Sequence, residues 1–234
     1  MMAELNLQGE LIPDDWAEVY RYWGFETGFY CPGDIRNAIA NLAPGEDLVL
    51  EINSIGGSVD AAAEIYSMIQ KLTNPTRAEI QSLAASAASY FPLACDRVEI
   101  SLPAQMMIHC ASWRIGGNKH DHAWTAKQLD VTDNAILDVY CRKCGEKTSR
   151  EELNRMMEEE TYLSAQECLK LGLVDAIIGE AVQDDPGLGL VASVHDNTVR
   201  AMRTLPDIQE LMARRDAQLA ELDKQLAEEQ ARYT

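Results

Sequence analysis

A serine, a histidine and a group of carboxylates stand in an order that could support nucleophilic catalysis. Ser86 lies in a run of small residues, His109 ends an apolar segment, and three consecutive glutamates follow further along the chain. In serine-based acyl transfer, a histidine takes the proton of the attacking hydroxyl and a carboxylate orients that histidine. These residue types permit Ser86 as nucleophile, His109 as general base and one of Glu158, Glu159 and Glu160 as the orienting acid.

The small-residue run from Ser82 to Ser89 has two interpretations. It follows a strand-like segment and continues into an apolar helix that we expect to reach about Cys95. A serine at the first turn of a helix meets N–H groups that lack an intrahelical acceptor, and these suit a developing oxyanion. The alternative is a buried helix packed closely through Ala and Ser, with His109 as a structural residue at a strand end.

A pair of glycines supplies a second group of backbone donors. The apolar strand Leu48–Ile52 runs into Asn53-Ser54-Ile55-Gly56-Gly57-Ser58, and Ser58 is typical of a helix N-cap. Glycines between a strand and a helix allow backbone N–H groups to point at a ligand. The N–H groups of Gly57 and Ala87 could therefore form an oxyanion hole, although a plain glycine turn is equally compatible with the sequence.

Strands and helices alternate along most of the chain. This alternation predicts an α/β domain with a mainly parallel sheet. The segment Pro13–Phe25 could be a short helix or a capping loop. The expected strands are Leu5–Leu11, 48–52, 76–81, 96–101, 103–109 and 173–178, and the expected helices are 32–42, 58–72, 120–144 and two short ones that open with the capping boxes Ser149-x-x-Glu152 and Ser164-x-x-Glu167.

The charge and cysteine content restrict the possible partners. The 234-residue chain has a formal net charge of -18, which disfavours nucleic acid and anionic membranes as ligands. We see no signal peptide and no apolar run of membrane length, so a cytoplasmic protein with reduced thiols is expected. No cofactor is implied. Cys141-x-x-Cys144 has no second cysteine pair to complete a zinc site, and His120-x-His122 fits a solvated helix start better than a metal site.

Several motifs, taken in order, closely resemble the Clp peptidase family of serine proteases. They cover about Leu5 to Ile178, and the phage-type branch of prohead (head maturation) proteases is the most similar. The motifs are Ile52-Asn53-Ser54-Ile55-Gly56-Gly57, Leu83-Ala84-Ala85-Ser86, Met107-Ile108-His109, Tyr162-Leu163-Ser164-Ala165 and Gly172-Leu173-Val174-Asp175.

The resemblance implies a fold, a function and an assembly. The fold is the Clp/crotonase fold of stacked ββα units, and the activity is peptide-bond cleavage with Ser86 as nucleophile and His109 as base. Housekeeping members carry Asp three residues before the Leu-Ser-Ala segment, where this chain has Glu160. Glu160 is therefore the expected third residue, as in the phage-like branch. The family typically forms rings, so a ring-shaped homo-oligomer acting on polypeptides is expected, with phage capsid or scaffold proteins as possible partners.

Two other functions share these features. A crotonase-type acyl-CoA enzyme has the same fold and paired N–H donors but needs no Ser/His pair, and a catalytically silent scaffold protein would keep the fold alone. Nothing in the sequence identifies an AAA+ ATPase partner. Cys110, beside His109, is discounted as a nucleophile because the next residue along a strand points to the opposite face.

The C-terminal region differs in character from the rest. We expect the peptidase domain to span residues 1–180, a linker 181–205 and a charged helical tail 206–234. Apolar residues of the tail fall at heptad-compatible positions interrupted by Arg215, which indicates a narrow seam rather than a core helix. The seam comprises Ile208, Met212, Leu219, Leu222 and Leu226.

Overall fold

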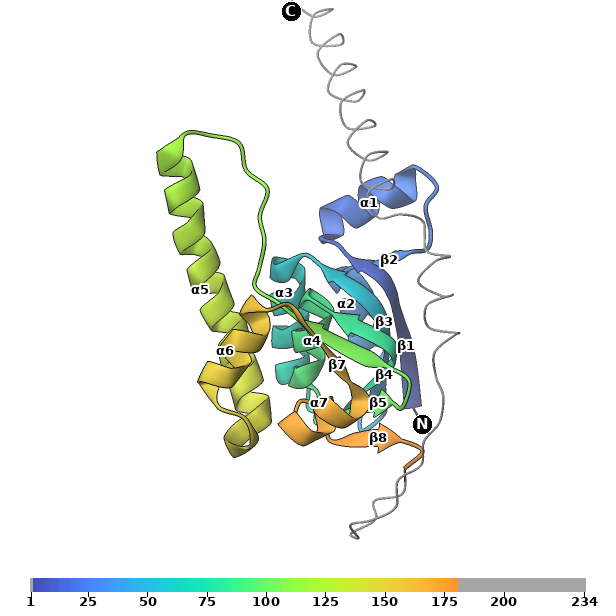
Figure 1. Cartoon of the computed structure of the whole chain (residues 1–234). Coiled ribbons are helices and arrows are strands. Elements are labelled where there is room, and N and C mark those ends of the chain that lie inside the picture. The colour runs from blue at the N-terminus through green and yellow to red at the C-terminus, as the bar shows by residue number, and fades with distance from the viewer. Residues whose placement is uncertain (1, 181–234) are drawn as a thin grey trace, which may run out of the picture. The chain divides into compact units, whose positions relative to one another are not determined.

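The computed structural model describes residues 2–180, which form an α/β unit around one eight-stranded sheet (Figure 1). The strand order is β2-β1-β3-β4-β5-β8, and β6 pairs with β4 and carries β7. Every pairing is parallel except that of β6 with β7. The expected α/β fold with a mainly parallel sheet is confirmed.

The elements follow the predicted alternation. The strands are β1 (Met2–Leu11), β2 (Phe29–Tyr30), β3 (Asp47–Gly57), β4 (Thr76–Ala85), β5 (Arg97–Ser101), β6 (Gln105–Ile108), β7 (Thr161–Ser164) and β8 (Ala176–Ile178). The helices are α1 (Asp14–Tyr22), α2 (Pro32–Asn41), α3 (Val59–Gln70), α4 (Ala87–Tyr90), α5 (Lys119–Cys144), α6 (Arg150–Glu158) and α7 (Ala165–Leu171), with short 3-10 turns at Phe91–Ala94 and Gly145–Lys147.

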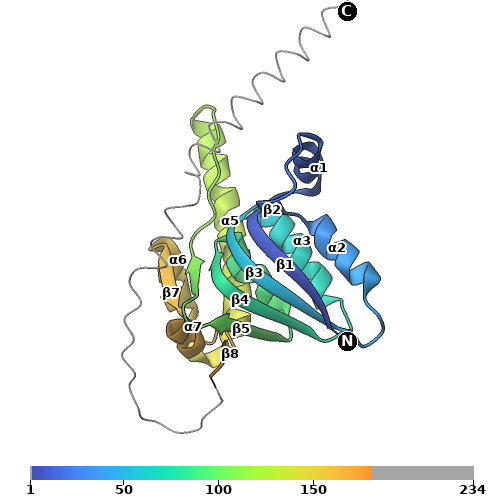
Figure 2. The same cartoon turned by 90° about the vertical axis from the view of Figure 1, so that its right-hand side faces the viewer.

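The core lies on one face of the sheet. Along β3, fully buried Leu50 and Ile52 alternate with half-buried Glu51 and Asn53, so the two faces differ in polarity. Figure 2 shows the neighbouring strands β1, β3 and β4 side by side at full length, and Figure 1 shows α3, α4 and α5 on one side of them. The side chains facing these helices form a continuous apolar core.

Two strands extend further than the sequence predicts. β3 continues through the glycine pair to Gly57, and β4 continues from the predicted end at Gln81 to Ala85. Alanine and glycine have low strand propensity, so local sequence signals an early end. Pairing overrides it here, because Ala84 and Ala85 lie opposite Met106 and Met107 of β6. The ambiguous segment after Pro13 forms α1.

The helix ends match their expected signals in most cases. Ser58 caps α3, and Ser164 with Glu167 forms the predicted capping box of α7. The Ser149 hydroxyl oxygen caps α6 by accepting from the Glu152 N–H, but the Glu152 carboxylate does not accept from the Ser149 N–H, so the predicted capping box is only half formed. The long helix α5 protrudes well beyond the sheet in Figure 1, and two of its apolar side chains, Trp124 and Val131, are exposed.

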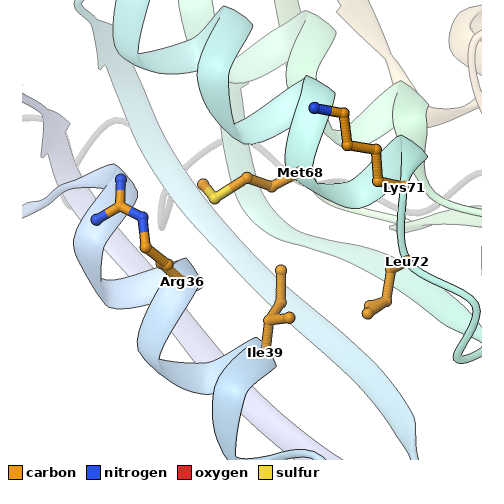
Figure 3. Close-up of a pocket in the computed structure, with 5 residues that line it drawn as sticks. All are labelled: Arg36, Ile39, Met68, Lys71 and Leu72. Atoms are coloured by element: carbon orange, nitrogen blue, oxygen red, sulfur yellow. The ribbon is translucent and has the colours of Figure 1, made fainter.

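A pocket lies between α2 and α3, apart from the chemistry-bearing residues. Figure 3 shows the side chains of Ile39, Met68 and Leu72 directed into it, with Arg36 and Lys71 at its rim. Arg36 forms ion pairs with Asp14 of α1 and Glu64 of α3. None of these residues was expected to take part in catalysis.

The predicted linker 181–205 and tail 206–234 lie outside the described residues. Within residues 2–180, no helix combines the length and apolar character that crossing a membrane requires.

Candidate active site

The Oγ atom of Ser86 lies 2.6 Å from Nε2 of His109. Both side chains are half-buried, so they remain accessible from one side while their backbones are held in the core. A hydrogen bond of this length between a hydroxyl and an imidazole is the arrangement in which the ring can take the hydroxyl proton. The structure therefore brings together the predicted nucleophile and the predicted base.

Parallel strand pairing explains why these two residues meet. Ser86 follows the last residue of β4, and His109 follows the last residue of β6. Ala85 lies opposite Met107 in the parallel ladder, and the Ser86 N–H donates to the Met107 carbonyl at 2.9 Å. Parallel strands end at the same edge of a sheet, which is where open α/β sheets commonly place their ligand sites.

The backbone of Ser86 has an uncommon conformation. Its φ is 55° and its ψ is -125°, a region that non-glycine residues rarely adopt. This sharp turn connects β4 directly to α4. A residue in a rare conformation between a strand and a helix points to a functional role for its side chain, because the strain must be offset by the surrounding structure.

Gly56 forms the wall against which this turn packs. A Cβ atom on Gly56 would lie 2.5 Å from the Ala85 carbonyl oxygen, 2.7 Å from the Ser86 Cβ and 2.8 Å from the Ala87 nitrogen. With φ at +88°, Gly56 also adopts a conformation that disfavours side chains. The end of β3 therefore approaches Ser86 closely because this position has no side chain.

The two predicted oxyanion-hole residues, Gly57 and Ala87, directly follow Gly56 and Ser86 in the chain. Ala87 is the first residue of α4, where an N–H has no intrahelical acceptor. Gly57 follows Gly56 and pairs with Leu11 of β1, where a Cβ would lie 2.1 Å from the Leu11 carbonyl oxygen. Sequence reasoning assigned Gly57 to the site but missed that Gly56 is the residue packed against Ser86.

The antiparallel pairing of β6 with β7 brings Glu160 towards His109. Ile108 and Thr161 form the last pair of this ladder, and His109 and Glu160 are the residues that flank this pair in the two segments. The Met157 carbonyl accepts from the N–H groups of both Cys110 and Glu160, each at 3.2 Å, which fixes the two chain segments to one point. Glu160 is therefore near His109 in the fold, although neither residue belongs to a strand and Glu160 has a φ of 50°.

The three glutamates differ in their present partners. Glu158 accepts from the Asn154 amide, and Glu159 forms an ion pair with Arg155. Within residues 2–180, the Glu160 carboxylate has no hydrogen bond or ion pair, and the only side-chain hydrogen bond of His109 is the one to Ser86. A carboxylate at Nδ1 is therefore not in place in this structure, and Glu160 is the one whose side chain is uncommitted.

Cys110 is adjacent to His109, but its thiol has a different environment. Both residues lie beyond the end of β6, so strand alternation does not separate them as the sequence argument assumed. Burial, followed by the nearby Asp133 carboxylate, raises the pKa of Cys110 to about 11. The thiol is therefore protonated near neutral pH and is a poor nucleophile there.

Two polar contacts of the site escaped sequence reasoning. The Ser89 hydroxyl donates to the Ser86 carbonyl and contacts the hydroxyl of Tyr140 on α5. Asp133, also on α5, accepts from the Ala111 N–H at 2.6 Å. Ser89 belongs to the small-residue run that the sequence singled out, but its contact with α5 was not predicted, and no local signal marks Tyr140 or Asp133.

The residues considered for metal binding are not assembled into a site. Among residues 2–180, no group of three or more His, Cys, Asp or Glu side chains is arranged to hold a metal ion. Cys141 and Cys144 are free thiols, and His120 and His122 are exposed near the start of α5.

Comparison with known proteins finds similarity to Clp proteases, both in a family model and in individual relatives. Residues 37–181 match the sequence model of the Clp protease family. The ATP-dependent Clp protease proteolytic subunit 1 of Chlamydia muridarum is 34% identical over 140 residues, covering 58% of this chain and 72% of that protein. The subunits of the same name from Chlamydia trachomatis (34% identical, 58% and 71% covered) and Protochlamydia amoebophila (31% identical, 58% and 66% covered) are similar over the same share of this chain.

Proposed function

Because the chain belongs to the Clp protease family, we propose that it is a serine endopeptidase in which Ser86 is the nucleophile and His109 the general base. The observation that carries the proposal is the 2.6 Å contact between Ser86 Oγ and His109 Nε2 at the edge of the sheet. The same contact favours a peptidase over a crotonase-type acyl-CoA enzyme or a silent scaffold, since neither needs this pair.

The proposed reaction follows from these positions. The Ser86 oxygen attacks the carbonyl carbon of the scissile bond while His109 Nε2 takes the hydroxyl proton. The Gly57 and Ala87 N–H groups stabilise the negative oxygen of the tetrahedral intermediate. His109 then donates the proton to the leaving amine, and a water molecule, activated by the same ring, hydrolyses the acyl-enzyme and frees Ser86.

Glu160 completes the proposed catalytic residues. Its carboxylate would accept from Nδ1 of His109 and stabilise the imidazolium that forms during attack. Support comes from the β6–β7 register and from the shared Met157 carbonyl. The side chain of Glu160 is exposed, so we expect it to rotate toward the ring, and it is one methylene longer than that of Asp.

Covalent labelling tests the function directly. A fluorophosphonate probe should label the wild-type chain, and peptide mass spectrometry should locate the adduct on Ser86. The Ser86→Ala variant should not be labelled, whereas Ser82→Ala, which changes an exposed serine on the same strand, should be labelled normally. Absence of an adduct on the folded wild type, or an adduct on another serine that persists in Ser86→Ala, would refute the proposal.

The finer proposal concerns assembly and biological setting. We expect a ring-shaped homo-oligomer in which the protruding helix α5, with exposed Trp124 and Val131, contributes contacts between copies. Sedimentation velocity at micromolar concentration should give a species several times the mass of one chain, and a monomer would contradict this.

A phage head maturation role would be supported by Ser86-dependent cleavage of a capsid or scaffold protein in the host cytoplasm.

A further inference from the structure

We propose that Ser89 and Tyr140 are positioning residues that hold the backbone of Ser86 in its reactive conformation. This inference rests on the proposed serine peptidase function, but it concerns two residues that do not touch a substrate. It starts from a buried chain of hydrogen bonds that connects the long helix α5 to the turn after β4.

The chain of hydrogen bonds has a defined direction. The Ser89 hydroxyl donates to the Ser86 carbonyl oxygen at 2.5 Å, and its oxygen lies 2.6 Å from the Tyr140 hydroxyl. A serine hydroxyl has one proton, so Tyr140 must donate to Ser89 while Ser89 donates to Ser86. Successive hydrogen bonds of this kind polarise and strengthen one another in a buried environment.

The Ser86 backbone needs external support. With φ at 55° and ψ at -125°, it occupies a sparsely populated region that persists only when neighbouring contacts over-determine it. Its N–H is fixed by the Met107 carbonyl, and its own carbonyl accepts from both the N–H and the hydroxyl of Ser89. The Ser89 side chain therefore supplies one of these three hydrogen bonds, which hold the two peptide units on either side of the Ser86 Cα.

Burial makes this support rigid. Ser89 is 0% exposed and Tyr140 is 1% exposed, so water cannot replace either hydroxyl if it is removed. Burial raises the pKa of Tyr140 above its ordinary value, which keeps the phenol protonated and able to donate. Tyr140 lies on the same face of α5 as Asp133, seven residues earlier, which accepts from the Ala111 N–H just beyond His109. Helix α5 therefore contacts both the turn that carries Ser86 and the segment that follows His109.

The test compares Tyr140→Phe and Ser89→Ala with a matched control. Thr148→Val removes another buried hydroxyl that donates to a backbone carbonyl, that of Leu171, away from Ser86. Peptide hydrolysis should show kcat lowered about tenfold in Tyr140→Phe and in Ser89→Ala, with KM unchanged and Thr148→Val near wild type. The double variant should be little worse than the poorer single variant, because both changes break one chain.

Two further measurements separate this inference from the function on which it rests. Hydrogen exchange of the Ser86 and Ser89 amides should accelerate in Tyr140→Phe but not in Thr148→Val, whatever the enzyme's activity. Fluorophosphonate labelling of the wild type reports on the function alone, and its absence would overturn both proposals. Normal wild-type labelling combined with unchanged kcat and unchanged amide exchange in Tyr140→Phe would overturn the positioning role only.

Discussion

Ser86 Oγ and His109 Nε2 are within hydrogen-bond distance because the strands that precede them, β4 and β6, pair in parallel and end at the same edge. The pair depends on this register, since shifting one strand by one residue would turn its side chain to the other face. The catalytic proposal therefore predicts large losses of activity from substitutions at Ser86 and His109, and small losses from substitutions at neighbouring polar residues.

Replacing the nucleophile should abolish peptide hydrolysis without unfolding the protein. Ser86→Ala removes only a hydroxyl whose partner is His109, so circular dichroism and thermal unfolding should stay close to wild type. The rate of peptide hydrolysis should fall by on the order of 10⁴-fold or more, as for other serine peptidases that lose the nucleophile. Retention of a tenth of the activity in Ser86→Ala would exclude covalent catalysis by this residue.

Glu160→Gln should impair catalysis far more than Glu158→Gln. An amide keeps the size of the side chain but cannot stabilise the imidazolium charge, so kcat should fall on the order of 10²-fold or more. Glu158 is paired with Asn154 on the surface of α6, which makes its variant a suitable control. Equal effects of the two changes, or a larger effect at Glu158, would remove Glu160 from the proposed triad.

The sequence predicted the reactive residues Ser86 and His109 better than it predicted the contacts that hold them in position. The alternation of elements predicted the parallel sheet, and Ser58 and Ser164 marked helix starts correctly because capping is a local interaction. The extension of β4 to Ala85 was missed, because it depends on pairing with a strand twenty residues away. The contact between Ser89 and Tyr140 spans 51 residues and leaves no periodic trace in the sequence.

Gly56→Ala should destabilise the protein and inactivate it together. The added methyl would overlap the Ala85 carbonyl and the Ser86 Cβ, and the φ of +88° disfavours a side chain. Overpacking and backbone strain together should lower the free energy of unfolding by about 2–4 kcal/mol. Urea denaturation gives this change, and fluorophosphonate labelling under native conditions should be lost even where the variant remains folded.

The matched control for this change is Gly116→Ala in the loop before α5. A Cβ there would have no atom within 4 Å, and no positive φ disfavours it, so stability and labelling should be unchanged. If Gly56→Ala matched Gly116→Ala in unfolding free energy and in fluorophosphonate labelling, the close approach of β3 to Ser86 would not be required for stability or for reactivity.

The thiol beside His109 should react slowly at neutral pH. Burial and the Asp133 carboxylate raise the pKa of Cys110 to about 11, so at pH 8 the thiolate fraction is on the order of 10²-fold smaller than for an unperturbed cysteine. Alkylation of Cys110 by iodoacetamide, followed by peptide mass spectrometry, should accelerate as pH rises toward 11. Asp133→Asn removes a negative charge, which lowers the pKa of Cys110 and should increase its alkylation rate at pH 8. If the pH dependence of Cys110 alkylation in the wild type had its midpoint near the ordinary cysteine pKa, the raised pKa would be wrong. Cys110 would then again be a candidate nucleophile.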